Sequence, residues 1–217
     1  MAFTEQILME IANGIFKGGY NMSDNFLYKE YELCFNQLQF YDNRQINLIK
    51  YLITITSSVA TALFALYKFL EEPTQEFYLC QTFLTAIIFI VSVLIYLSML
   101  QNRLYFVFVA RQLNAIRKFF LENETSDFKD NQLYTSTDFP AIKPSSVHSL
   151  LFIGATILSS LFAGASIYSF LLYIQYGSLW WIGILGFIVL FGIEFGGGVA
   201  YLTSSGKKSA DDAIHNN

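Results

Sequence analysis

The sequence has little charge, proline or cysteine, and these shortages exclude several classes of protein. Only 14% of its 217 residues are charged, whereas 54% are hydrophobic and 18% are aromatic. A soluble domain has about 25% charged residues, so this composition excludes a disordered chain, a collagen-like fibre and a basic protein that coats nucleic acid. The two cysteines, Cys34 and Cys80, form no CxxC pair. Neither a disulfide framework nor a cysteine zinc site is therefore expected.

Enzymatic signatures are also missing from the sequence. It contains no H-E-x-x-H, G-x-S-x-G, Walker A or EF-hand pattern. The two histidines, His148 and His215, lie far along the chain from any cluster of carboxylates. We therefore expect neither an enzyme, nor a cofactor, nor a metal site. The net charge of −4 provides no overall attraction for duplex nucleic acid, so any anion site must be local.

The sequence does contain long apolar runs. A bilayer core of about 30 Å needs roughly 20 apolar residues for each helical span. Four segments satisfy this requirement, over residues 46–70, 77–101, 149–175 and 179–203. The sequence therefore predicts an all-α, polytopic membrane protein with two transmembrane hairpins, at 46–101 and 149–203.

The parts outside these hairpins are expected to lie in the cytosol. Residues 1–45 contain a short amphipathic helix at 4–17 and then a stalk helix, residues 102–148 form a helix and a loop, and residues 204–217 form a tail. Neither proline nor glycine occurs at 23–72 or at 77–121. Because these residue types break helices, we expect both helices of the first hairpin to continue out of the membrane as a paired stalk.

The basic residues predict the orientation of the chain in the membrane. Of the 13 lysines and arginines, all except Lys68 lie before or at the mouth of the first span, between the second and third spans, or after the fourth. Cytoplasmic loops carry an excess of lysine and arginine. We therefore expect a multi-pass protein of the inner (plasma) membrane, with the N-terminus and the C-terminus both inside.

Glu194 is an acidic residue within the fourth span, 14 residues after Trp180. This places it about 21 Å into the hydrocarbon core, where a carboxylate costs roughly 2–3 kcal/mol. It is an ion-pathway ligand, a gate or a proton site. Alternatively, a shift in the register of the span places it nearer the inner surface, or it is protonated and hydrogen-bonded in a packed interface. The neighbouring Gly196, Gly197 and Gly198 indicate either a hinge with unwound backbone or close packing against another helix.

A stripe of hydroxyl side chains runs along the first span. Its members are Thr54, Ser57, Ser58 and Thr61, and spacings of three and four residues place them on one helical face. Such a stripe can line a water-filled pore. It can equally bond to carbonyls in the preceding turn or to a neighbouring helix. The stripe is therefore a candidate ion pathway, with packing as its alternative.

A basic stripe follows the second span. Arg103, Arg111, Asn114 and Lys118 fall within about 80° of one another around a helix, with Arg117 on their flank. Three interpretations remain open: a solvated positive face, contact with anionic lipid headgroups, or a site for an anionic ligand such as a nucleotide or short oligonucleotide.

The layout of residues 24–122, with the segment Asn102–Phe120, resembles small membrane effectors of bacterial nucleotide-signalled antiphage defence, including SLATT-type proteins and Hailong channel effectors. The chain has four spans where the SLATT pattern has two. The resemblance implies a homo-oligomeric channel that a nucleotide or oligonucleotide controls, with the lipid bilayer and further copies of the chain as partners. The alternatives are a structural or assembly membrane protein, and a small transporter that uses Glu194 as its coupling carboxylate.

Overall fold

The chain folds into four long helices. The computed structural model describes residues 22–70, 73–123, 135–138, 140–143 and 146–207. Over these ranges the elements are α2 (Met22–Phe69), α3 (Gln75–Asn123), α4 (Val147–Tyr173), a short 3-10 turn η1 (Gly177–Leu179) and α5 (Trp180–Ser205). The described residues contain no strand, which confirms the all-α prediction. The amphipathic helix predicted at residues 4–17 lies outside them.

All four helices are long and apolar enough to cross a membrane. The chain therefore has the architecture of a multi-pass membrane protein, as predicted. α2 and α3 have 48 and 49 residues, so each is roughly 70 Å long at about 1.5 Å per residue. This is more than twice the roughly 30 Å of a bilayer core. The prediction of two unbroken helices that are much longer than a membrane span is confirmed.

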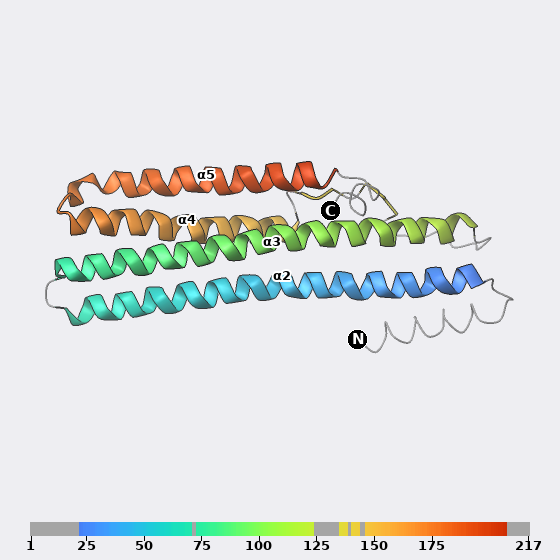
Figure 1. Ribbon diagram of the computed structural model, residues 1–217, viewed down its shortest axis with the longest axis horizontal. Coiled ribbons are helices and arrows are strands. Elements are labelled where there is room, and N and C mark those ends of the chain that lie inside the picture. The colour runs from blue at the N-terminus through green and yellow to red at the C-terminus, as the bar shows by residue number, and fades with distance from the viewer. Residues whose placement is uncertain (1–21, 71–72, 124–134, 139, 144–145, 208–217) are drawn as a thin grey trace.

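The helices lie side by side in chain order, so that α2 and α5 occupy the two edges of the row (Figure 1). Burial agrees with this arrangement. In the most apolar 18-residue window of each helix, 17% of α2 and 11% of α5 is buried, against 33% of α3 and 39% of α4. Each edge helix therefore has a broad face that no other described helix covers.

The stalk, which we define as residues 22–45 of α2 and 102–123 of α3, extends beyond α4 and α5 (Figure 1). Its small core consists of Cys34, Leu113 and Ile116, against which Tyr31 and Phe35 pack. The apolar side chains between the two helices explain why the pair stays together outside the four-helix part.

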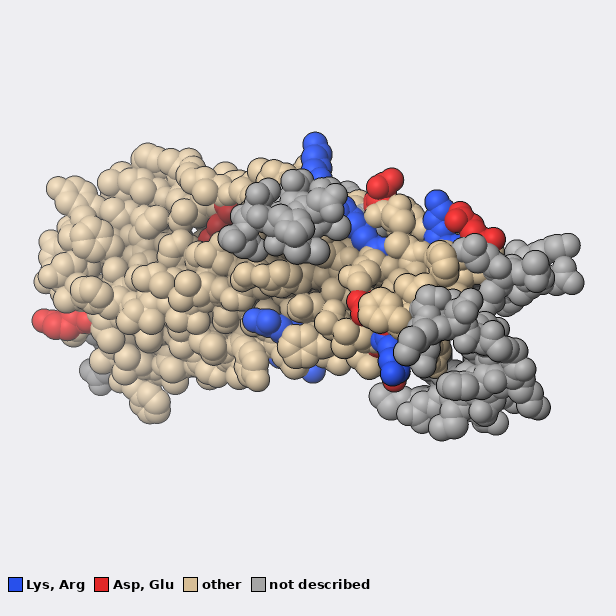
Figure 2. Space-filling view, turned by 45° about the vertical axis from the view of Figure 1, so that its right-hand side comes forward, with Lys and Arg blue, Asp and Glu red and all other residues tan. Residues whose placement is uncertain are grey.

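A larger core lies where the stalk joins the four-helix part. Leu52, Met99, Val107 and Leu202 are almost fully buried there. Lysines, arginines and acidic residues gather over the stalk half of the surface in Figure 2, while the other half is almost entirely uncharged. The surface thus divides into an apolar part that suits lipid and a charged part that suits water.

Candidate functional site

The predicted hydroxyl stripe lies on the uncovered face of α2. Thr54, Ser57, Ser58 and Thr61 are all exposed on the chain. Ser57 Oγ donates to the carbonyl of Thr54 at 3.2 Å, and Thr61 Oγ1 donates to the carbonyl of Ser57 at 2.8 Å. These bonds within the helix satisfy the hydroxyl protons but leave the oxygens facing outward. The stripe is therefore not used for packing within the chain.

The same face of α2 continues into the stalk with the opposite polarity. Phe26, Leu33 and Phe40 are 65%, 52% and 59% exposed. They follow one another at intervals of seven residues, and two further intervals from Phe40 lead to Thr54. A period of seven keeps side chains on one face of a gently supercoiled helix. We call this line the outward face of α2, from Phe26 to Thr61.

Glu194 lies between three helices at the middle of the four-helix part. Its Oε1 accepts a hydrogen bond of 2.9 Å from Ser159 Oγ on α4. The hydroxyl of Tyr96 on α3 donates to the Glu194 backbone carbonyl at 2.8 Å. Glu194 Oε2 is buried and has no hydrogen-bond partner. The carboxyl group therefore faces protein and is only half satisfied.

The three glycines after Glu194, at positions 196, 197 and 198, are all helical, because α5 is continuous to Ser205. Their surroundings nevertheless differ. A side chain at Gly198 would overlap the Tyr96 hydroxyl, so this glycine makes room for Tyr96. A Cβ at Gly196 or Gly197 would meet nothing within 4 Å. Gly198 thus serves packing within the chain, whereas Gly196 is exposed and Gly197 borders a groove between α3 and α5.

Two of the predicted anion-binding residues hold other segments in place. Arg103 is 3% exposed, and its Nε donates to the Ala141 carbonyl at 3.0 Å. Arg111 Nη1 donates to the Gly206 carbonyl, just beyond the end of α5, at 2.6 Å. Both guanidinium groups therefore connect α3 to segments that return to it from later in the chain.

Two more of these residues also make contacts within the chain. Asn114 is buried, and its side-chain amide donates to the Ser136 carbonyl at 2.8 Å. Arg117 donates to the Tyr31 hydroxyl on α2, with distances of 3.4 Å from Nε and 3.3 Å from Nη2. Its guanidinium carbon also lies 5.6 Å from the centre of the Tyr31 ring. Arg117 therefore links the two helices of the stalk.

Lys118 is the most exposed of the predicted set. Its Nζ lies 3.7 Å from Glu122 Oε1, one turn further along α3, with both side chains more than half exposed. The five predicted anion-binding residues thus lie along α3 but contact different segments. Within one chain, they do not converge on a single cavity.

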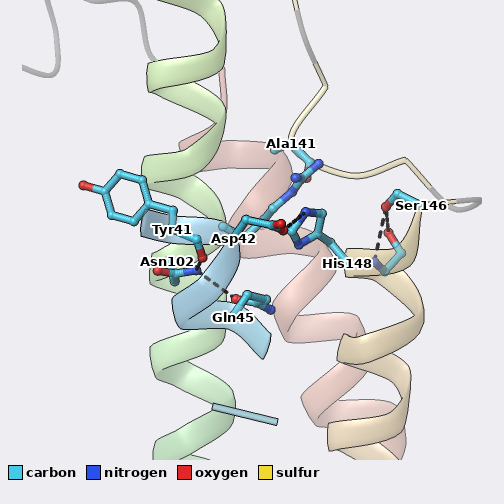
Figure 3. A network of polar contacts seen from close by, with 9 residues as sticks. Tyr41, Asp42, Gln45, Asn102, Ala141, Ser146 and His148 are labelled. Atoms are coloured by element: carbon cyan, nitrogen blue, oxygen red, sulfur yellow. Dashed lines mark hydrogen bonds and ion pairs between the residues drawn. The ribbon is translucent and has the colours of Figure 1, made fainter. Parts of the chain in front are cut away.

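A buried polar network that the sequence analysis missed joins α2 and α3 at the base of the stalk (Figure 3). The side-chain amide of Asn102 donates to the Tyr41 carbonyl at 2.8 Å and to Gln45 Oε1 at 3.0 Å. Gln45 Nε2 and Asn102 Oδ1 are buried without a partner. In the sequence, Gln45 and Asn102 look like ordinary polar residues of the stalk, so only their burial in the structure identifies them as members of a network.

The network extends to α4 through a contact between an imidazole and a carboxylate. His148 Nε2 lies 3.4 Å from Asp42 Oδ1, and both side chains are drawn in Figure 3. The Phe106 ring lies beside both the His148 ring and the Arg103 guanidinium, at 5.2 Å and 5.1 Å between centres. These contacts connect the first hairpin to the second where the stalk begins. Movement of the stalk must therefore disturb this junction.

No metal site accompanies these features in the part of the chain that the structure describes, where no three His, Cys, Asp or Glu side chains come together. The fold and its surface define an all-helical, four-span membrane protein with a helical stalk. Searches against protein-family models, curated proteins and solved structures found no match to the chain. Its function must therefore be argued from the geometry alone.

Proposed function

We propose that the chain is one subunit of a homo-oligomeric ion channel of the inner (plasma) membrane, with both termini in the cytosol. The subunits would assemble through the outward face of α2, and the cytosolic stalk would control the opening of the pathway. The observation that carries this proposal is the polarity of the outward face. It is apolar at Phe26, Leu33 and Phe40, outside the apolar span, and bears hydroxyl groups at Thr54 and Thr61, within it.

This polarity is the reverse of what an isolated subunit needs. Removing a phenylalanine or leucine side chain from water contributes about 1.5–3 kcal/mol, so three exposed ones in the stalk favour a protein partner. In the bilayer, by contrast, a lipid-facing helix would be covered with apolar side chains. A second copy of the chain that packs on the stalk and leaves water beside Thr54 and Thr61 satisfies both parts of the face.

The continuity of α2 supports control from the cytosol. One helix without a break connects the stalk residues Phe26 and Phe40 to Thr54 and Thr61. A rotation or tilt of the stalk would therefore reorient the hydroxyl groups of the proposed pathway. The junction formed by Asp42 and His148 lies between the two parts, where it can stabilise one of the positions.

A nucleotide or short oligonucleotide is the proposed regulatory ligand. Lys118 and Arg117 support this part of the proposal, because Lys118 is exposed and Arg117 is partly exposed on the stalk. Several subunits around one axis would bring these charges together, although a single chain does not. Native mass spectrometry after gentle extraction measures stoichiometry and retained ligand together. An oligomer that carries a nucleotide mass supports the proposal, a ligand-free oligomer contradicts the ligand, and a monomer contradicts the assembly.

Ion flux through liposomes tests the pathway. In a Cys80→Ser background, which removes the exposed native thiol, single cysteines would replace Thr54, Ser58 or Thr61. A charged thiol reagent should then change the flux of each variant, because the added charge would stand in the pathway. Ile188→Cys is the control, since Ile188 is exposed on α5, at the other edge of the row of helices. Equal effects at Ile188 and at the hydroxyl positions would contradict the proposed pathway.

A further inference from the structure

We propose that Glu194 is a proton-binding site within the membrane, where its carboxyl group carries a proton on Oε2 and is open to chemical modification. The inference does not depend on the channel proposal, because it concerns contacts within one chain. Glu194 lies 14 residues from the start of α5 and 11 from its end, or about 21 Å and 16 Å along the helix. It is therefore far from water at either membrane surface.

The hydrogen bonds around the carboxyl group leave one oxygen unsatisfied. Ser159 Oγ donates to Oε1, whereas Oε2 is buried without a donor. The Tyr96 hydroxyl also reaches Glu194, but its proton is directed to the Glu194 backbone carbonyl. A carboxylate accepts hydrogen bonds at both oxygens, and only the protonated acid has a hydroxyl group of its own. Burying a charged carboxylate with one oxygen unbonded costs more than burying the neutral acid in the same place, so this arrangement favours the acid.

The charges around Glu194 also favour the protonated form of its carboxyl group. In the described ranges, no lysine, arginine or histidine pairs with it. The titratable groups that line the adjoining groove are Tyr96 from α3 and Tyr201 from α5, while α4 presents Ser159 and the fully buried Ser160. Because neither tyrosine is a cation at any pH, no residue that lines this groove compensates a negative charge at Glu194. A bound proton removes that charge.

The site can be reached from the bilayer. Glu194 lines a groove of about 510 Å³ between α3 and α5, whose other walls are mainly apolar. Gly197 lies on the same groove, and a side chain added there would meet no other atom within 4 Å. A small apolar molecule dissolved in lipid can therefore approach the carboxyl group, whereas a charged reagent cannot.

Dicyclohexylcarbodiimide tests the proposal, because it dissolves in lipid and reacts with protonated carboxyl groups. The acid proton moves to one carbodiimide nitrogen, a carboxyl oxygen bonds to the central carbon, and the acyl group then migrates to nitrogen. The product is an N-acylurea that retains every atom of both reactants. In liposomes containing the full chain, we expect this adduct on the peptide with Glu194. Above the titration midpoint, the labelling rate should fall about tenfold for each pH unit, because the acid ionises.

Three controls make the result decisive. Glu194→Gln should lose the adduct, while Glu122, an exposed carboxyl on the stalk, should remain unlabelled in the unmodified chain. Gly197→Cys, treated with a lipid-soluble maleimide, reports whether reagents enter the groove. If Gly197→Cys reacts but Glu194 stays unlabelled at every pH, the proposal is wrong. Protection of Glu194 by sodium at constant pH would also overturn it, in favour of a bound metal cation.

Discussion

At the scale of single residues, the closest fit in the membrane part is that of Gly198 against Tyr96. The Tyr96 hydroxyl occupies the space where a Cβ on Gly198 would stand. We predict that Gly198→Ala lowers the stability of the protein by about 1–3 kcal/mol, as overpacking usually does. The thermal midpoint of detergent-solubilised protein, followed by size-exclusion chromatography, measures the effect.

Neighbouring glycines supply the control for this prediction. Gly196→Ala and Gly197→Ala add a Cβ in open space, so each should leave stability unchanged or raise it by about 0.5–1 kcal/mol. Tyr96→Phe should recover much of the loss in the Gly198→Ala background, because it removes the atom that clashes. Equal losses at all three glycines would contradict this account and indicate a general intolerance of the segment.

Glu194→Gln is a second prediction at the residue scale. An amide keeps the size of the side chain but never carries a charge or a transferable proton. If the carboxyl group takes part in ion passage, the variant should change the pH dependence of flux in liposomes while its thermal midpoint stays close to that of the parent. Flux that matches the parent at every pH would remove Glu194 from the pathway.

The sequence alone could identify some of these residues but not their partners. Glu194 is noticeable because a carboxylate in an apolar run is rare and costly. Nothing local in the sequence indicates that Tyr96 reaches its carbonyl or that Ser159 reaches its carboxyl group, because these contacts depend on how α3, α4 and α5 pack. The orphaned atoms of Gln45 and Asn102 are likewise visible only once burial is known.

At the scale of elements, α4 and α5 approach each other most closely at a pair of glycines. A Cβ at Gly164 would lie 2.8 Å from the Gly183 carbonyl oxygen, which is backbone and cannot move aside. We predict that Gly164→Ala forces the helices apart and lowers stability by about 1–3 kcal/mol. Gly154→Ala, on the same helix but with open space around it, should have no such cost. Equal thermal midpoints for the two variants would contradict the close crossing.

The basic residues of α3 differ in what they contribute to its contacts with other elements. Arg111 bonds to the end of α5, so Arg111→Ala should lower stability by about 1.5–3 kcal/mol, the usual value for a charged hydrogen bond. Lys118→Ala removes an exposed pair within one helix and should cost at most about 0.5 kcal/mol. Thermal midpoints of the two variants measure the difference. A larger loss for Lys118→Ala would show that the stalk packs differently.

Most of the helix boundaries could be predicted, because they follow from simple local chemistry. The absence of proline and glycine from residues 23–69 and 77–121 allows the two long helices, and Pro73 separates them. The roles of Arg103 and Arg111 could not be predicted in the same way. A basic side chain on a helix looks the same in the sequence whether it meets a solvent, a ligand or a backbone carbonyl from a distant segment.

At the scale of the whole molecule, the row of four helices leaves the outward face of α2 without a partner among the residues that the structure describes. We predict that Leu33→Glu and Phe40→Glu dissociate the oligomer while the subunit keeps its helical content, because both side chains are exposed on the chain. Light scattering coupled to chromatography measures the mass, and circular dichroism measures the helix content. Gln39→Glu adds the same charge on another exposed face of α2 and should leave assembly intact.

The overall architecture was predictable, whereas the interface was not. Four apolar runs of the right length fix the number of spans, but each taken alone could face lipid, protein or water. The spacing of seven residues between Phe26, Leu33 and Phe40 was present in the sequence. It became informative only when the structure placed these residues opposite α3, on the side that none of the four described helices covers.

Disulfide cross-linking in native membranes tests the central claim most directly. Single cysteines at Phe26 and Phe40, in the Cys80→Ser background, would be oxidised and compared with Ile188→Cys on α5, where Ile188 is 56% exposed. Assembly through the stalk part of α2 predicts cross-linked pairs of subunits for Phe26→Cys and Phe40→Cys, and none for Ile188→Cys. Cross-linking at Ile188 alone, or at none of the three positions, would contradict the account.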